Sequence, residues 1–230
     1  AEFIHGPYHL WFLYSLAGLY LLTPILRKAA ADGKTLAYFL IMFAAVNVVT
    51  QYLIYVPKIG GMISDFIERT GLRAVTGYMG YFMLGYFLYS KKDNMSKKTE
   101  TAIYVIGILM LIATIAAECF ISEELRKTDF VKQYMKPNVI LYSAAIYAFF
   151  VMKISKIHYS ERTRKVFAVF TECGFGVYCI HAILNEFVPT PVIKSLPFTT
   201  SLLRVACLYA LSLALTWLIR KIPFVGKKIT

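Results

Sequence analysis

The sequence has few charged residues for its length and many apolar ones. Only 17% of its 230 residues are charged, whereas 58% are hydrophobic and 16% are aromatic. A water-soluble domain of this length cannot bury so much apolar surface in one core, so a soluble globular class is excluded. Lipid is the alternative solvent, because runs of about 20 apolar residues match the ~30 Å hydrocarbon layer of a bilayer. The composition therefore predicts an all-α integral membrane protein.

Acidic residues are also scarce, with 13 Asp and Glu against 25 Lys and Arg, which gives a net charge of +12. In a soluble protein such an excess suggests a nucleic-acid partner. Here most basic residues stand in short clusters between apolar runs, and no basic and aromatic stripe lies outside those runs. Clusters in such places fix topology and meet anionic headgroups. The expected partner is membrane lipid, and no nucleic acid is expected.

Cysteine is rare, and the motifs of several enzyme classes are missing. Cys119, Cys173, Cys179 and Cys207 lie in apolar surroundings without a Cys-x-x-Cys spacing, so small core hydrophobes explain them better than a metal site or disulfides. The sequence contains no nucleophile elbow, Walker loop, dinucleotide-binding glycine pattern or metal-ligand cluster. We therefore expect no metal.

Seven apolar stretches are long enough to cross a bilayer, and polar segments with turn residues such as Pro57, Gly60 and Pro137 separate them. They cover about residues 10 to 26, 35 to 56, 74 to 90, 101 to 121, 138 to 154, 166 to 188 and 200 to 222. The sequence has no internal repeat or low-complexity tract. It thus predicts one domain over residues 1–230, a polytopic bundle of about seven transmembrane helices.

The basic residues of alternate loops predict an orientation. One set of loops holds sixteen, namely Arg27, Lys28, Lys34, Lys91, Lys92, Lys97, Lys98, Lys153, Lys156, Arg162, Arg164, Lys165, Arg220, Lys221, Lys227 and Lys228. The other set holds eight, namely Lys58, Arg69, Arg73, Arg126, Lys127, Lys132, Lys136 and Lys194. Cytoplasmic loops carry the excess of Lys and Arg, so we expect an extracytoplasmic first residue and a cytoplasmic C-terminus.

Two of the predicted outer loops carry apolar residues at helical spacing. These are Ile59, Met62, Ile63, Phe66 and Ile67 in one loop, and Phe130, Val131, Tyr134 and Met135 in the other. Each pattern predicts a short amphipathic helix, which either lies on the membrane surface or packs on protein as a lid.

With this orientation, most polar residues inside the spans fall toward the outer ends of their helices. They are His9, Trp11 and Tyr14 in the first span, Arg73 before the third, Glu118 ending the fourth, His181, Asn185 and Glu186 in the sixth, and Arg204 in the seventh. Ionisable groups at membrane depth usually face a bundle interior or a wet cavity, which favours one outward-facing chamber. Interfacial snorkelling and aromatic belts are the alternative for His9, Trp11, Arg73 and Glu118.

His181 shares a helix face with Asn185, four residues on, whereas Glu186 is turned roughly 140° away at 3.6 residues per turn. A neutral histidine at this depth either contacts a hydroxyl-bearing substrate or makes a structural hydrogen bond. In the third span, Gly77, Gly80 and Gly85 among the tyrosines indicate close helix packing, with a tyrosine-lined lumen as the alternative.

A basic cluster on the predicted cytoplasmic side has two interpretations as well. Arg162, Arg164 and Lys165 either hold the phosphates of an anionic cofactor or follow the positive-inside rule alone.

Three motifs, in order along the chain, resemble those of the bacterial membrane acyltransferase-3 family. The stretch from Tyr8 to Arg27 is similar to that family's His-Leu-Trp-Phe-Leu helix. Tyr81-Phe-Met-Leu-Gly-Tyr-Phe-Leu88 resembles its Tyr-Phe-x-Leu-Gly-Tyr helix, and Phe175-Gly-Val-Tyr-Cys-Ile-His181 resembles its Gly-x-Tyr-x-x-His helix. The ending Ile222-Pro-Phe-Val-Gly226 is similar to the family's usual close, so the resemblance covers the whole chain.

The resemblance implies an O-acyltransferase of about ten helices in the bacterial inner membrane. It would move an acyl group, usually acetyl from cytoplasmic acetyl-CoA, onto hydroxyls of envelope saccharides or related acceptors. The family's catalytic base is a His that follows an Arg by some ten residues, and no such pair precedes Leu10. We therefore expect that base upstream of Ala1, with this chain forming the last seven helices.

The resemblance also implies roles for individual residues. His9, Trp11, Tyr178 and His181 match the family's motifs and are expected to shape the acceptor or acyl channel. With the polar residues Glu186 and Arg204 they form the predicted substrate-binding set, while Arg162, Arg164 and Lys165 are the predicted ligands of the acetyl-CoA phosphates.

A membrane transporter or solute-binding module is the main alternative from another class, since related domains fused to serine racemases are thought to import the amino acid. A seven-helix receptor fits the predicted orientation, but the sequence lacks the Asp-Arg-Tyr and Asn-Pro-x-x-Tyr signatures of the large receptor class. A requirement for acetyl-CoA favours the enzyme, and solute accumulation without an acyl donor favours transport.

Overall fold

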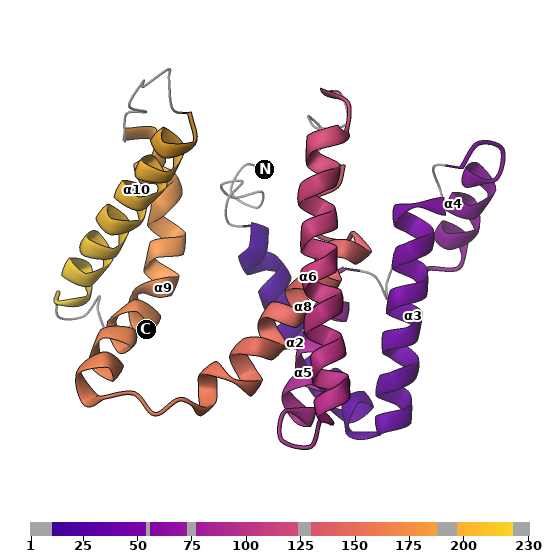
Figure 1. The fold of residues 1–230 in the computed structure, drawn as a ribbon, viewed down its shortest axis with the longest axis horizontal. Coiled ribbons are helices and arrows are strands. Elements are labelled where there is room, and N and C mark those ends of the chain that lie inside the picture. Colours follow the sequence, from indigo (N-terminus) through magenta and orange to yellow (C-terminus); the bar gives the residue numbers. More distant parts are fainter. Residues whose placement is uncertain (1–10, 54–55, 73–76, 124–129, 188–196, 223–230) are drawn as a thin grey trace. The chain divides into compact units, whose positions relative to one another are not determined.

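The computed structural model describes residues 11–53, 56–72, 77–123, 130–187 and 197–222, and every regular element in these ranges is a helix (Figure 1). In chain order the elements are α2 (Trp11–Ala31), α3 (Gly33–Gln51), α4 (Gly60–Arg69), α5 (Tyr78–Lys91), α6 (Lys97–Phe120), α8 (Pro137–Met152), the 3-10 turn η4 (Ile154–Lys156), α9 (Glu161–Phe187) and α10 (Pro197–Arg220). The all-α prediction is confirmed.

Local sequence explains where two of the long helices begin. Asp32 precedes α3, and its carboxylate accepts hydrogen bonds from the Thr35 hydroxyl at 2.6 Å, the Thr35 N–H at 2.9 Å and the Lys34 N–H at 3.4 Å. In that order these bonds stabilise the charged form and hold the pKa of Asp32 below its usual range. Ser96 precedes α6, where its hydroxyl accepts from the Thr99 N–H at 3.1 Å.

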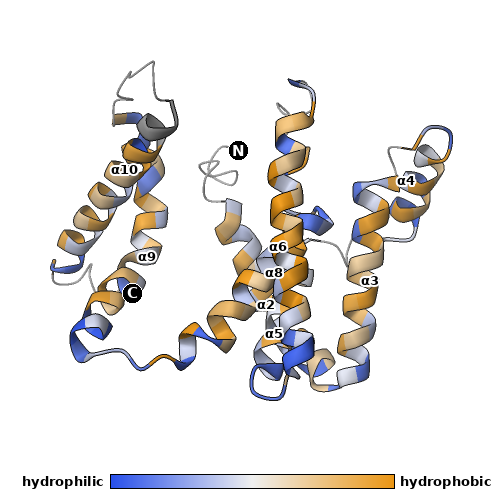
Figure 2. Ribbon diagram, in the orientation of Figure 1, coloured by the Kyte–Doolittle hydropathy of each residue, from blue (hydrophilic) through white to orange (hydrophobic). Residues whose placement is uncertain are grey.

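Five helices in the described ranges are long and apolar enough to cross a bilayer, namely α3, α6, α8 with its extension to Lys156, α9, and the Leu202–Arg220 part of α10. Ile108, Ile112 and Ile115 of α6 are each more than half exposed, and Figure 2 shows hydrophobic residues along most of this helix. Such a surface is stable in lipid rather than in water. The predicted spans 10 to 26 and 74 to 90 correspond to the helices α2 and α5, which are not among these five. The number of membrane-spanning helices is therefore approximate.

Packing divides the chain into two compact units. Unit 1 comprises Ala1–Phe12 and His158–Thr230, with α9 and α10, and unit 2 comprises Leu13–Ile157, with α3, α4, α5, α6 and α8. Helices of one domain can pack into two compact groups, so these units are not evidence of two separately folding domains. The single domain over residues 1–230 therefore stays a prediction.

Small residues bring the helices of unit 2 close together. A Cβ atom added at Gly107 of α6 would lie 2.2 Å from the Cβ of Ala145 in α8, and one added at Gly80 of α5 would lie 2.1 Å from the Phe43 ring of α3. Helices in lipid associate largely through such close packing, because lipid removes the hydrophobic driving force between them. The packing interpretation of the third span's glycines is thus confirmed at Gly80.

In unit 1, α9 and α10 pair in the same way. Gly176 of α9 faces Thr216 of α10, whose Cγ2 would lie 2.3 Å from an added Cβ. The buried Thr216 hydroxyl donates to the Ser212 carbonyl at 2.8 Å, so it is satisfied within its own helix. At the end of α10, Arg220 Nη2 lies 2.7 Å from Glu172 Oε2 of α9 and closes the pair.

The first predicted amphipathic helix is present as α4. Ile67 is buried, and Ile63 and Ile67 share an apolar groove of about 380 Å³ with Val46 and Val49 of α3. Met62 is 73% exposed. The helix thus directs part of its apolar surface toward α3 and leaves part of it uncovered.

The second predicted amphipathic helix was wrong, because residues 130–135 form turns. Side chains of neighbouring helices bond to the backbone of this segment. The Tyr81 hydroxyl of α5 donates to the Tyr134 carbonyl, and Asn138 Nδ2 of α8 donates to the Val131 carbonyl at 3.1 Å. These two bonds, the first from a residue 53 positions away and the second from one seven positions away, favour the turn over the helix that the apolar spacing predicts.

Lys136, at the end of this turn, points into the protein. It is 1% exposed, and its Nζ donates to the Gln51 carbonyl at the end of α3 at 2.8 Å. The same Nζ lies 3.9 Å from the centroid of the Phe130 ring and 4.8 Å from that of Tyr52. Burial lowers the pKa of Lys136 from its ordinary value. The lysine thus ties the turn to α3, which a pattern of apolar residues does not reveal.

Candidate functional site

His181 stands half-buried toward the end of α9, and its hydrogen bonds define its tautomer. Its Nδ1 lies 2.6 Å from the Tyr178 carbonyl and 3.2 Å from the Val177 carbonyl. A carbonyl oxygen can only accept, so Nδ1 carries a hydrogen and donates it. In the neutral ring Nε2 then holds the lone pair, which can accept a hydrogen bond or a proton from a hydroxyl.

A row of aromatic rings leads from the start of α2 to His181. The rings of Trp11 and Phe12 meet edge to face at 6.1 Å between centroids, and Phe12 meets Tyr178 in the same way at 6.0 Å. The Tyr178 ring in turn lies 5.8 Å from the His181 ring. Unit 1 therefore brings together three predicted site residues, Trp11, Tyr178 and His181, with Phe12 between the first two.

Arg204 of α10 reaches the same end of α9. Its Nη2 donates to the Asn185 carbonyl at 3.3 Å, while its Nε is buried and has no hydrogen-bond partner among the described residues. Glu186 is exposed, and no ion pair joins it to Arg204 in the described part of unit 1. Arg204 is thus fixed by the α9 backbone rather than by the neighbouring carboxylate.

Other members of the predicted chamber are placed differently. His9 and Arg73 lie outside the described residues. Glu118 belongs to unit 2, where its Oε2 lies 3.3 Å from Lys132 Nζ. The single chamber that includes these three therefore stays a prediction.

The three predicted phosphate ligands stand at the beginning of α9, where Arg162, Arg164 and Lys165 are all exposed. Arg164 and Lys165 line an open pocket of about 310 Å³ together with Glu161 and Ala168, and Arg162 is not part of its wall. The partial positive charge of a helix N-terminus adds to the two cationic side chains. Two of the three residues therefore share a pocket, in which the Glu161 carboxylate offsets one of the two positive charges.

Comparison with known families decides the assignment. A family model described as an acyltransferase domain, that of acyltransferase family 3, matches residues 2–221. The chain belongs to acyltransferase family 3. A search of curated proteins and a search of solved structures each gave no significant match.

Membership of acyltransferase family 3 confirms the resemblance drawn from the three motifs and indicates acyltransferase activity in a membrane protein. Two residues of unit 1 were not predicted from the sequence.

Phe12 lies inside the first motif and contacts both Trp11 and Tyr178, so the motif itself was a signal for it. Arg220 contacts both Glu172 and the Cys173 thiol, with its Nη1 3.8 Å from Cys173 Sγ. In the sequence it counted only as one of the basic residues of the predicted cytoplasmic loops.

Proposed function

We propose that this acyltransferase family 3 protein transfers an acyl group, acetyl from cytoplasmic acetyl-CoA, to a hydroxyl of an envelope saccharide or related acceptor. The family match over residues 2–221 is the observation that carries the proposal. His181 supports it, because an imidazole whose Nδ1 lies against two backbone carbonyls has Nε2 as its second polar atom, and that atom can exchange a hydrogen bond with a hydroxyl. Trp11, Tyr178, Glu186, Arg204 and His9 are the other proposed substrate residues.

The proposed reaction is a direct transfer between two bound substrates. A base removes the proton of the acceptor hydroxyl as its oxygen attacks the thioester carbonyl, then the carbon–sulfur bond breaks and the coenzyme A thiolate leaves and takes up a proton. Hydrogen-bond donors around the carbonyl oxygen stabilise the charge that develops there. The base is proposed to be a histidine of the kind that the family carries, while His181 Nε2 orients the acceptor hydroxyl.

The proposed topology follows from the basic loops. The protein is placed in the bacterial inner membrane with the Lys91 to Lys98 turn and the start of α9 facing the cytoplasm, because these segments carry the excess of Lys and Arg. Arg164 and Lys165 would then meet the acetyl-CoA phosphates on the side where the donor is made, and His181 would lie toward the outer face. Arg162 would contribute only general positive charge.

Transfer of label from acetyl-CoA tests this function. The full-length gene product, in membranes supplied with radiolabelled acetyl-CoA and an envelope saccharide fraction, is expected to place label on the acceptor in an alkali-labile ester. Membranes without the protein provide the control. If instead a solute accumulates in sealed vesicles without any acyl donor and no ester forms, the protein is a transporter and the proposal is wrong.

A further inference from the structure

Arg204 places a positive charge among apolar residues of α10. It lies near the start of the Leu202–Arg220 segment, which is apolar enough to cross a membrane, and the side chains of Leu203 and Val205 beside it are each more than half exposed. An ionised side chain in such surroundings is costly unless it faces a polar interior or meets an opposite charge. The position of Arg204 therefore predicts a partner of negative charge.

The guanidinium group of Arg204 is held against α9. Its Nη2 donates to the Asn185 carbonyl at 3.3 Å, and its Nε is buried. This contact continues the antiparallel pairing of α9 and α10, in which Arg220 meets Glu172 farther along. Asn185 lies one turn beyond His181 on the same face of α9, because residues four apart are neighbours on a helix. The pairing thus brings Arg204 to the turn that follows His181, whereas a side chain that snorkels extends to the headgroups instead.

The described residues of unit 1 supply no carboxylate that balances this charge. Arg220 is paired with Glu172, but no ion pair reaches Arg204. Glu186 is exposed, and it is turned about 100° from Asn185 at 3.6 residues per turn, so its carboxylate leaves α9 in a different direction. Nη1 of Arg204 forms no hydrogen bond to a described residue. Nη1 and the second hydrogen of Nη2 are therefore available to a ligand.

We propose that Arg204 binds a carboxylate of the acceptor, and that the enzyme therefore acts on acidic saccharides. A guanidinium holds a carboxylate through two parallel N–H···O bonds, for which Nη1 and Nη2 are available. One guanidinium balances the single charge of a carboxylate, whereas a phosphate monoester carries about two charges at neutral pH. His181 then contacts a hydroxyl of the same acceptor about one helical turn, ~5 Å, away. The inference rests on the proposed function, because it names the substrate class of that same site.

Phospholipid headgroups are a second source of the same chemistry, since a phosphodiester also carries one negative charge. The two sources affect different properties of the enzyme. A carboxylate on the acceptor determines which acceptors are used, whereas a headgroup bound by Arg204 makes the rate depend on the lipid composition. Acceptor preference and lipid dependence are therefore measured separately.

A matched pair of acceptors tests the assignment. One is the acidic oligosaccharide of an envelope saccharide fraction, and the other is the same material with its carboxylates converted to neutral methyl esters, which adds no hydroxyl. The full-length protein in phosphatidylcholine vesicles is given radiolabelled acetyl-CoA. We expect kcat/KM for the acidic acceptor to exceed that for the ester by about tenfold or more, the usual effect of a hydrogen bond between charged groups.

Three variants attribute this preference to Arg204. Arg204→Gln should make the two kcat/KM values equal by lowering the one for the acidic acceptor, and Arg204→Lys should keep part of the preference, because the charge remains and the paired N–H groups are lost. Arg69 is exposed at the end of α4, in unit 2, so Arg69→Gln should keep the wild-type preference. The preference is a ratio within one protein, so a smaller folded fraction does not change it.

Four results contradict the inference or the function on which it rests. If the wild type acylates both acceptors equally, or if a folded Arg204→Gln keeps the wild-type preference, the inference is overturned and the proposed function stands. If phosphatidylglycerol in the vesicles raises the wild-type rate and Arg204→Gln abolishes that effect alone, Arg204 binds a headgroup and the inference is again overturned. If neither acceptor receives label from the wild type, the proposed function falls as well.

Discussion

Replacing His181 with alanine is expected to lower kcat/KM for the acceptor by roughly ten- to hundredfold, the effect of losing one hydrogen bond to a group that becomes charged. The expectation follows from the Nδ1 contacts with the Tyr178 and Val177 carbonyls, which make Nε2 the ring nitrogen proposed to contact the acceptor hydroxyl. Because His181 is proposed to contact the acceptor, KM for acetyl-CoA should not change. Steady-state rates with each substrate varied in turn measure both quantities.

Two further variants distinguish this role of His181 from a general loss of folding or stability. His181→Gln should retain part of the activity, because its amide oxygen can accept a hydrogen bond near the place of Nε2. His158 is exposed before α9 and lies outside the aromatic row, so His158→Ala should behave as the wild type. A folded His181→Ala protein with wild-type kcat/KM for the acceptor would exclude His181 from the site.

Replacing Gly107 with alanine is expected to destabilise the protein by about 1–3 kcal/mol, the usual cost of overpacking a tight contact. The added Cβ would lie 2.2 Å from the Cβ of Ala145, so α6 and α8 must separate. This loss exceeds the gain of about 0.5–1 kcal/mol that alanine brings in a helix interior. The midpoint of thermal unfolding in detergent, followed by tryptophan fluorescence, should fall.

A methyl swap supplies the matched test of that contact. In the double variant Gly107→Ala with Ala145→Gly, the methyl group moves from α8 to α6, and the other atoms near the new Cβ lie at 3.7 Å, an ordinary contact distance. The double variant should recover much of the lost stability. Gly18→Ala, with no atom within 4 Å of the added Cβ, should not lower the midpoint. Equal midpoints for Gly107→Ala and Gly18→Ala would show that the α6–α8 contact is not as tight as described.

The sequence predicted the helices well, because apolar runs of membrane length leave few alternatives. All seven stretches correspond to helices, and the apolar spacing from Ile59 to Ile67 correctly indicated α4. The similar spacing from Phe130 to Met135 failed, since Tyr81 of α5, 53 residues before Tyr134, bonds to that backbone. Contacts between residues far apart in the chain cannot be read from local periodicity.

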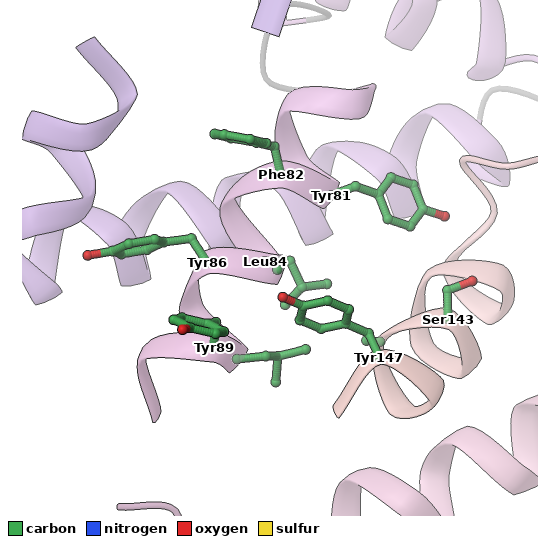
Figure 3. Close-up of a pocket in the computed structure, with 10 residues that line it drawn as sticks. Tyr81, Phe82, Leu84, Tyr86, Tyr89, Ser143 and Tyr147 are labelled. Carbon is green, nitrogen blue, oxygen red and sulfur yellow. The ribbon is translucent and has the colours of Figure 1, made fainter. Parts of the chain in front are cut away.

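The candidate site was predicted only in part, because contacts between different helices cannot be read from local sequence. The motifs pointed to Trp11, Tyr178 and His181, which unit 1 brings together. Glu186 was chosen because acidic residues are rare in spans, yet its side chain is exposed on α9. The tyrosine spacing on α5 does not show that Ser143 and Tyr147 of α8 line the same pocket (Figure 3), and the polar lumen that those tyrosines suggested stays a prediction.

Sided membrane vesicles test most directly whether this acyltransferase takes its donor from the cytoplasm. Sealed inside-out and right-side-out vesicles, both carrying the full-length protein and the envelope acceptor, receive radiolabelled acetyl-CoA in the external medium. Acetyl-CoA does not cross a bilayer, so the account predicts labelled acceptor in inside-out vesicles and none in right-side-out ones. Label confined to right-side-out vesicles would contradict it.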